Sequence, residues 1–332
     1  MTSPAAPIGR EAQRRSLKIG TRGSPLALAQ AHDIAARLAA AHGLSGDEAT
    51  ERFPITVIET RGDQVLDRAL SALGGKGLFT REIDAAQLEG RVDLAVHSMK
   101  DVPTVLPDGL TLAAVTPRED VRDAFISTRA DGIDDLPSGA VVGTASLRRQ
   151  AQLLRRRPDL RVVMFRGNVQ TRLRKLEEGQ ADATFLAMAG LNRLGMAEIA
   201  TSPIATEAML PAVAQGAVGV AIRVSDREAA ELLAPLNCAK TALRVAAERA
   251  FLKRLDGSCR TPLAGLAELD GTGALRLRGE VLLPDGAERH GVEWTGPAAN
   301  EAEAAQLGDA AALELLAVAG PEFMARVAEA AQ

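Results

Sequence analysis

The chain has 332 residues, a formal net charge of −4, 46% hydrophobic residues and only 2% aromatic residues. This length predicts two or three domains, and the negative charge and the scarcity of aromatic side chains argue against a nucleic-acid-binding protein. No apolar run reaches the roughly 20 residues of a membrane-spanning helix, and two cysteines cannot form a disulfide framework or a cysteine-rich zinc site.

The chain begins with a segment, residues 1–16, that contains no apolar core of a signal peptide. We therefore expect a disordered tail and a cytoplasmic protein. The first predicted strand is Leu17–Thr21. Ser24 and Pro25 then have the residue types of a helix N-cap and first helical position, and the apolar periodicity that follows predicts a helix up to Gly43.

A second strand is predicted at Phe53–Thr60, and a glycine-rich loop around Lys76 precedes a helix that ends at Gly90. The loop superficially resembles the phosphate-binding loop of nucleotide hydrolases. Gly77 follows the lysine where that motif requires Ser or Thr, so this class is excluded. We hypothesise that the loop covers a binding cleft.

The stretch 92–104 is the most informative part of the chain. Its first six residues alternate between apolar and polar, which predicts a half-buried strand. The strand then leads to Ser98, Lys100 and Asp101 before Pro103 ends it. Open α/β sheets bind ligands at the carboxyl ends of their strands, and the alternation of strands and helices so far predicts a mostly parallel sheet.

A second series of strands and helices begins near residue 117. Ser146 and Asn168 have the residue types of helix N-caps, and a further helix carries Arg193. A strand region that contains two glycines then completes the two predicted α/β halves. The strands predicted in this series are Ala140–Thr144, Leu160–Phe165, Asp182–Met188 and the region Pro211–Arg223.

The sequence changes character from about Thr241, where a helix leads to a loop that contains Cys259. Three alternating strands with two hairpin signals and an alanine-rich helical segment follow, which predicts a small α+β domain. Arg260 favours the nucleophilic thiolate of Cys259, although an unreactive, half-buried thiol is the alternative. Cys238 has no such context and is interpreted as structural.

Arginines recur where predicted helices begin. Arg22 precedes one N-cap, Arg148 and Arg149 lie in the first turn of another helix, and Arg166 precedes a third. Helix starts already favour anions, and arginine grips carboxylates in a bidentate manner. The recurrence, together with the basic run 148–161, indicates a pocket for a small polyanionic ligand; solvated surface arginines are the alternative.

Several motifs together resemble the porphobilinogen deaminase (hydroxymethylbilane synthase) family, with departures at Ala214, Ala221 and Ser258, where the family usually has Gly, Glu and Gly. The match runs in order from about Leu17 and weakens after about residue 265. The motifs are TRGSPLALAQA, TRGD, GGKGLFTREI, AVHSMKDVPT, GTASLRRQAQL, RGNVQTRL, LAMAGLNRLG, PAVAQGAVG and the late GSC.

The resemblance implies a transferase that joins four porphobilinogen molecules head to tail into hydroxymethylbilane, with release of ammonia, in tetrapyrrole biosynthesis. It also implies a dipyrromethane cofactor attached covalently through Cys259. The four scattered histidines suggest no metal site. The implied fold has two periplasmic-binding-protein-like α/β domains and a small α+β domain that carries the cofactor. The domain boundaries are then 17–116 with 217–238 for the first domain, 117–216 for the second and 239–332 for the third.

The resemblance makes Asp101 the catalytic residue, which stabilises the cation left on the substrate when ammonia departs. The cofactor would be held by Cys259, Arg22, Ser24, Lys100, Asp101, Thr144, Ser146, Arg148, Arg149 and Arg166. The substrate would be held by Arg22, Lys76, Ser98, Arg149, Arg172 and Arg193.

We expect a monomer whose small-molecule substrate is porphobilinogen, with no nucleic-acid or membrane partner, and whose product passes to uroporphyrinogen-III synthase. Two other classes stay open on the residues alone. A receptor for an anionic solute would use the same two-lobed architecture, and an RNA-binding protein would use the basic run.

Overall fold

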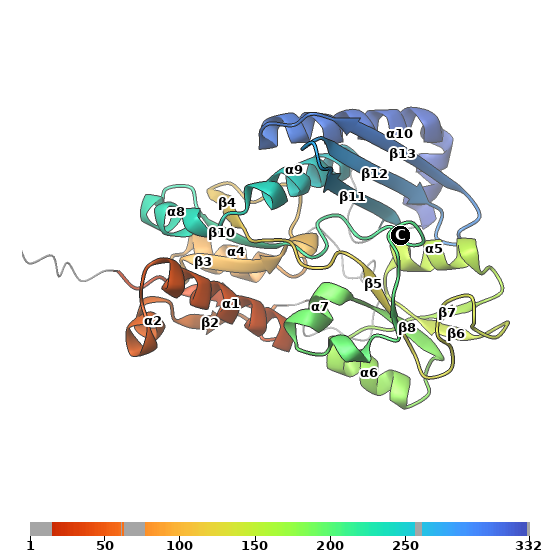
Figure 1. The fold of residues 1–332 in the computed structure, drawn as a ribbon, viewed down its shortest axis with the longest axis horizontal. Helices are drawn as coiled ribbons and strands as arrows, with labels where there is room; N and C mark the ends of the chain where they lie inside the picture. The colour runs from red at the N-terminus through yellow and green to blue at the C-terminus, as the bar shows by residue number, and fades with distance from the viewer. Residues whose placement is uncertain (1–14, 61, 63–76, 256–260, 331–332) are drawn as a thin grey trace, which may run out of the picture.

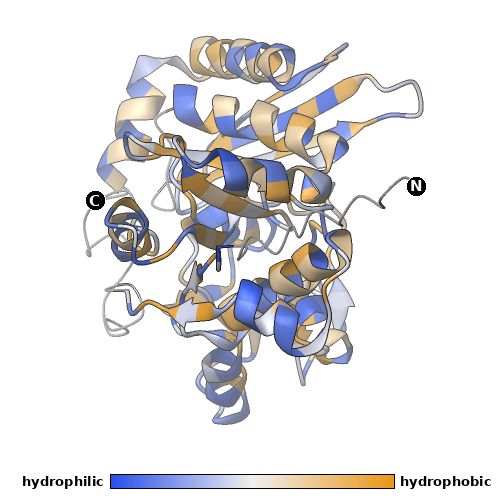
Figure 2. Cartoon of the chain, turned by 90° about the vertical axis from the view of Figure 1, so that its left-hand side faces the viewer, coloured by the Kyte–Doolittle hydropathy of each residue, from blue (hydrophilic) through white to orange (hydrophobic). Residues whose placement is uncertain are grey.

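The computed structural model describes residues 15–60, 62, 77–255 and 261–330, so most of the predicted tail, Lys76 and Cys259 lie outside the described part of the chain. Three sheets, each covered by helices, form the molecule (Figure 1). The predicted fold class, two α/β halves followed by a small α+β unit, is confirmed. Figure 2 shows helices whose hydrophilic and hydrophobic residues alternate along the ribbon, as expected for helices with one buried face.

The first sheet has the strand order β2-β1-β3-β10-β4. β1 pairs in parallel with β2 and β3, whereas β10 is antiparallel to both of its neighbours, so only half of the pairings are parallel. The strands are β1 (Ile19–Thr21), β2 (Ile55–Val57), β3 (Leu94–Ser98), β4 (Leu110–Val115) and β10 (Val218–Arg223). The helices around this sheet are α1 (Pro25–Ala41), α2 (Gly46–Arg52), α4 (Arg81–Leu88) and α8 (Arg227–Leu233).

The second sheet repeats this plan with the order β7-β6-β8-β5-β9. β6 is parallel to β7 and β8, and β5 is antiparallel to β8 and β9. The strands are β5 (Asp123–Ser127), β6 (Val141–Gly143), β7 (Arg161–Val163), β8 (Ala183–Ala187) and β9 (Ser202–Pro203). The helices of this half are α5 (Leu147–Arg156), α6 (Val169–Glu177) and α7 (Met188–Arg193). In each sheet four of the five strands run in the same direction and one strand, β10 or β5, runs against them, so the prediction of a mostly parallel sheet is confirmed in both halves.

The third sheet is the antiparallel meander predicted near the C-terminus, and two helices pack against it (Figure 1). Phe251 and Leu315 are fully buried in its core. The last helix bends at Gly320, whose φ of 76° breaks the helical backbone. The elements are α9 (Ala239–Arg254), β11 (Leu263–Leu269), β12 (Leu275–Leu282), β13 (Arg289–Gly296) and α10 (Glu301–Ala330).

The strand β3 is more deeply buried than its sequence pattern predicts. Leu94 and Val96 pack in the core that contains Ile34 of α1, while Ala95 packs with Ile83 of α4. Both faces of the strand are therefore covered, and the prediction of a half-buried strand is wrong. A central strand covered on both faces needs no polar side.

The chain crosses between the first two sheets twice, and the two crossings lie side by side. The backbone N–H of Glu119 donates to the carbonyl of Gly216, and the Arg118 side chain donates to the carbonyl of Gln215 at 2.9 Å. Arg118 also forms a buried ion pair with Glu248 of α9. In the second crossing, Ala214 has a φ of 60°, in the region that favours the glycine the family usually places there. These contacts join all three sheets at one point.

No helix in the described ranges is both long and apolar enough to cross a membrane.

Candidate functional site

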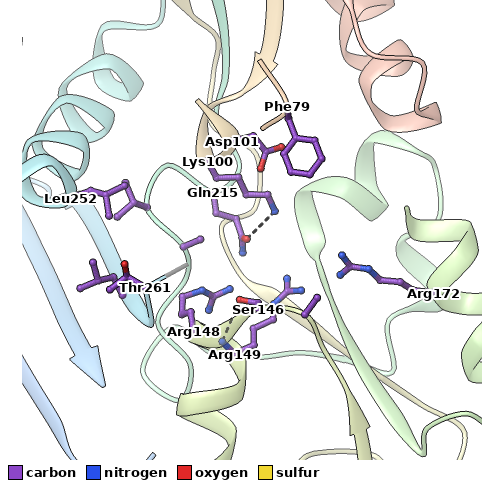
Figure 3. Close-up of a pocket in the computed structure, with 14 residues that line it drawn as sticks. Phe79, Lys100, Asp101, Ser146, Arg148, Arg149, Arg172, Gln215, Leu252 and Thr261 are labelled. Atoms are coloured by element: carbon purple, nitrogen blue, oxygen red, sulfur yellow. Dashed lines mark hydrogen bonds between the residues drawn. The ribbon is translucent and has the colours of Figure 1, made fainter. Parts of the chain in front are cut away.

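Two adjoining cavities, of about 490 and about 200 Å³, lie between the first two sheets, and we call them together the cleft. The smaller cavity extends toward the third sheet, where Thr261 lines it (Figure 3). Leu263 of the same sheet also contributes to the lining. The residues that line both cavities are Phe79, Lys100, Asp101, Ala145, Arg149 and Arg172.

The three helix caps predicted around the cleft are confirmed. The Ser24 hydroxyl accepts from the N–H of Ala27, and the Ser146 hydroxyl caps α5 in the same way. The Asn168 side chain caps α6. After β3, a single 3-10 turn, η2 (Met99–Asp101), carries Lys100 and Asp101 into the cleft, as expected at the carboxyl end of a strand.

Asp101 has a loose and partly open environment. Its side chain is 29% exposed, and the Arg22 guanidinium lies 3.9 Å from its carboxylate. Arg22 in turn stacks over the ring of Phe79, 4.1 Å from the ring centroid. The stacking fixes the direction of the guanidinium, while the Asp101 carboxylate keeps a face toward the cleft (Figure 3).

Asp123 has the opposite environment. It is fully buried and accepts from Arg148 at 2.8 Å, from Arg149 at 2.7 Å and from Gln215 at 2.9 Å. Burial opposes ionisation of this carboxyl, but the two guanidinium groups outweigh it and hold its pKa well below the usual range. Part of each guanidinium of Arg148 and Arg149 is thus used internally, and the remaining N–H groups are those that a ligand in the cleft can contact.

Arg149 nevertheless keeps an unused donor. Its Nε is buried and has no hydrogen-bond partner within the described part of the chain. Its Nη1 donates to the carbonyl of Phe185 at 2.9 Å and its Nη2 donates to Asp123, so the guanidinium is held in place while its Nε–H is unused. A buried donor without an acceptor costs free energy, which an acceptor on a bound ligand would recover.

Positive charge is crowded in the cleft. Burial lowers the pKa of Lys100 to about 8, against the opposing effect of Asp101. Burial, together with the charges of Arg149 and Arg166, lowers the pKa of Arg172 to about 10. Counting described residues only, six basic side chains and two carboxylates line the cleft. An anionic ligand would relieve this repulsion.

The structure brings most of the predicted site residues to the cleft, but not all of them. Ser98 exchanges hydrogen bonds with Gln30 in a side cavity of about 50 Å³. Thr144 is buried and accepts from the N–H of Ser146, and Arg193 donates to the carbonyl of Gly216 at 2.7 Å. Neither Thr144 nor Arg193 lines the cleft. Those that do are Arg22, Ser24, Lys100, Asp101, Ser146, Arg148, Arg149, Arg166 and Arg172.

Three residues of the site were missed by sequence reasoning, namely Phe79, Asp123 and Gln215. Phe79 and Gln215 lie inside motifs that carried the resemblance, yet neither has a residue type that suggests anion binding. Asp123 lies in a strand, β5, that the sequence analysis did not predict. A buried acid that neutralises two neighbouring arginines is visible only once the sheet is assembled.

Four of the six arginines in the basic run 148–161 form ion pairs. Besides the two arginines held by Asp123, Arg156 donates to Asp134 at 2.7 Å and Arg157 donates to Asp159 at 2.8 Å. Paired in this way, these side chains do not form a continuous basic surface. Within the described ranges, no group of three or more His, Cys, Asp or Glu side chains is arranged to hold a metal ion.

Comparisons with known proteins agree on one family. Residues 17–231 match the family model “Porphobilinogen deaminase, dipyromethane cofactor binding domain”, and residues 242–317 match “Porphobilinogen deaminase, C-terminal domain”. A porphobilinogen deaminase of Paracoccus denitrificans (strain Pd 1222) is 59% identical over 307 residues, which cover 92% of this chain and 96% of the relative. A chloroplastic porphobilinogen deaminase of Oryza sativa subsp. japonica is 53% identical over 321 residues, which cover 96% and 89%.

Similar solved structures include periplasmic proteins. The periplasmic VFT2 domain of Bordetella pertussis BvgS is 18% identical with a TM-score of 0.39, covering 67% of this chain and 86% of that chain. A periplasmic substrate-binding protein of an ABC transporter from Coxiella burnetii is 15% identical with a TM-score of 0.41, covering 66% and 91%.

Proposed function

The chain belongs to the porphobilinogen deaminase family, and we propose that the cleft between its first two sheets is the active site, with Asp101 as the catalytic carboxylate. The enzyme is a transferase that condenses four porphobilinogen molecules head to tail into hydroxymethylbilane and releases ammonia, in tetrapyrrole biosynthesis. The observation that carries the proposal is a partly exposed carboxylate held in a cleft lined by six basic side chains.

Asp101 suits the charge that develops during the reaction. When the aminomethyl group of porphobilinogen loses ammonia, a positive charge remains on the substrate's pyrrole ring. The ionised carboxylate stabilises that charge, and at about 4 Å with an effective dielectric near 20 one such pair contributes on the order of 4 kcal/mol before desolvation. The basic side chains meanwhile hold the acetate and propionate groups that each pyrrole carries.

The described residues fit the dipyrromethane cofactor of the family. Its acidic substituents need donors, and the unused Nε of Arg149 and the crowded positive charge of the cleft supply them. When bound, the cofactor supplies the pyrrole end to which substrate units are added. The described residues proposed to hold it are Arg22, Ser24, Lys100, Asp101, Ser146, Arg148, Arg149 and Arg166, with Arg22, Arg149 and Arg172 toward the substrate. Thr144 and Arg193 are proposed to act indirectly, through Ser146 and Gly216, and Ser98 from the side cavity.

We assign covalent attachment of the cofactor to Cys259, and a substrate contact to Lys76; both residues lie outside the described ranges. Support for the cysteine comes from Thr261, which lines the cleft. Thr261 is the second residue after Cys259 in the chain.

The proposal extends to the organisation and setting of the enzyme. The first domain comprises 17–116 and 217–238, which is supported by β10 pairing with β3 and β4. The second comprises 117–216 and the third 239–332. The enzyme acts as a cytoplasmic monomer without nucleic-acid or membrane partners, and its product passes to uroporphyrinogen-III synthase.

Intact-mass spectrometry and an ammonia assay test the function. The purified protein should carry extra mass equal to two deaminated substrate units and should release ammonia from porphobilinogen; saturable binding without ammonia release would instead indicate an anion receptor. Cys259→Ser should lose the extra mass. Cys238→Ser, the matched control at the other cysteine, should keep it. An unchanged adduct on Cys259→Ser would move the attachment elsewhere.

A further inference from the structure

Gln215 occupies the crossing by which the chain returns from the second sheet to the first. Its side chain is 1% exposed and lines the cleft between Lys100 of the first half and the arginines of the second (Figure 3). Neither the sequence patterns nor the reaction proposed above uses it. A buried amide at this point belongs to neither half alone.

The hydrogen bonds of Gln215 fix the orientation of its amide. The NH₂ group donates to Asp123 at 2.9 Å and to the carbonyl of Val121 at 2.8 Å. Because an ionised carboxylate and a carbonyl can only accept, the amide cannot be turned around. Its oxygen must therefore face Lys100, whose Nζ donates to it at 3.2 Å.

The amide completes a chain of contacts across the cleft. Lys100 donates to Gln215, Gln215 donates to Asp123, and Asp123 accepts from Arg148 and Arg149. Each group in the chain satisfies the next, so a shift at one end leaves a buried donor or acceptor unpaired. The ammonium group and the guanidinium groups are thereby held in one relative arrangement.

We propose that Gln215 is a positioning residue, which holds the ammonium group of Lys100 toward the cleft and ties it, through Asp123, to the guanidinium groups of Arg148 and Arg149. The inference rests on the proposed function, because it requires these cations to bind the carboxylates of the cofactor and of the substrate units that are added to it. Gln215 acts through other side chains and takes no part in bond making.

The charge state of Lys100 makes this role measurable. The charged groups that face Lys100 are Asp101 from its own turn, Asp123 from β5 and Arg148 and Arg149 from α5. With its pKa lowered to about 8, Lys100 loses its proton in an accessible pH range. Removing the acceptor oxygen of residue 215 should lower that pKa further, since a hydrogen bond to the charged form favours it.

The test compares the pH dependence of KM for porphobilinogen in three variants. In the wild type, KM should rise above about pH 8 as Lys100 becomes neutral. Gln215→Met should shift this rise to lower pH by at least half a unit and raise KM about tenfold at pH 8, with a smaller change in kcat. Gln215→Glu keeps an oxygen to which Lys100 can donate. In this variant KM should therefore begin to rise at the same pH as in the wild type or at a higher pH.

Gln152→Met is the matched control. Gln152 is also buried and also makes two hydrogen bonds, at 2.9 and 2.7 Å to the backbone of Leu210, but it has no contact with Lys100. Gln152→Met should lower the free energy of unfolding without shifting the pH at which KM rises. Equal profiles for Gln215→Met and Gln152→Met, or a Gln215→Glu rise below the wild-type pH, would overturn the inference. Absence of ammonia release by the wild type would instead refute the proposed function.

Discussion

Two aspartates near the cleft use the same chemistry in opposite settings. Asp123 is fully buried and accepts three hydrogen bonds from Arg148, Arg149 and Gln215. Asp101 is 29% exposed, and the Arg22 guanidinium lies 3.9 Å from its carboxylate. A carboxylate saturated by internal donors has little capacity left for a ligand, whereas one that is partly open can act on charge that develops in the cleft.

The comparison also separates two uses of arginine. Arg148 and Arg149 are anchored by Asp123, which holds their remaining N–H groups in a defined direction. Arg22 is positioned by stacking on Phe79. Anchored donors lose little conformational entropy when a ligand binds, so the buried aspartate supports binding indirectly. The structural carboxylate and the proposed catalytic carboxylate are thus complementary.

The largest expected effect is on stability, from Asp123→Asn. The substitution leaves two buried guanidinium groups without their counter-charge, and we expect the free energy of unfolding to fall by about 3–5 kcal/mol. Urea denaturation followed by circular dichroism measures the loss. Asp120→Asn is the matched control, because the more exposed ion pair between Asp120 and Arg122 should contribute about 0–1 kcal/mol. Equal losses in the two variants would contradict the structural role of Asp123.

Asp101→Asn should have the opposite effect to Asp123→Asn, with a loss of turnover and little loss of stability. We expect kcat to fall about 10²–10³-fold, because an amide cannot neutralise the transient positive charge, while the melting temperature stays near that of the wild type. Ammonia release and thermal denaturation measure the two quantities. A variant with near-wild-type turnover would remove Asp101 from the chemistry.

Two glycines test whether the contact between the third sheet and α5 supports the Asp123 cluster, by which we mean Asp123 with Arg148 and Arg149. Gly286, in the turn between β12 and β13, packs against α5, the helix that carries Arg148 and Arg149. A Cβ at Gly286 would lie 2.7 Å from the carbonyl oxygen of Ala151 in α5. Gly273, in the preceding turn, also has a positive φ, but a Cβ there would meet nothing within 4 Å.

We expect Gly286→Ala to lower the free energy of unfolding by about 2–4 kcal/mol, from the clash and the strained φ together. Gly273→Ala should cost only about 1–2 kcal/mol, from the φ alone. Chemical denaturation measures both. If the two losses are equal, the contact between the third sheet and α5 contributes nothing to the cluster.

The smallest expected effect concerns Lys100 and pH. Its pKa is lowered from 10.5 to about 8 in the folded protein, so above pH 8 the unfolded chain binds more protons than the folded one. The contribution of Lys100 to the free energy of unfolding should therefore increase with pH between about 8 and 10.5. Between pH 7.5 and 9, wild type should gain about 1 kcal/mol relative to Lys100→Met. A difference that is flat or falls with pH would show that burial does not disfavour the charged form of Lys100.

Sequence by itself determined the local features of this protein. The caps at Ser24, Ser146 and Asn168 were predictable because each depends on a hydrogen bond within three residues along the chain. The position of Lys100 and Asp101 followed from the end of a strand, and ordered motifs identified the family. The hairpins of the third sheet were equally local.

Only the tertiary structure decided which of these groups meet. Asp123 and Arg148 are 25 residues apart, and Lys100 and Gln215 are 115 residues apart. No short-range pattern encodes such pairs, because they depend on strand order and on the antiparallel strands β5 and β10. The same holds for β3, which is buried on both faces because α1 and α4 cover it. Local hydrogen bonding is a property of neighbours in the chain, whereas burial and charge pairing arise only when distant segments are packed together.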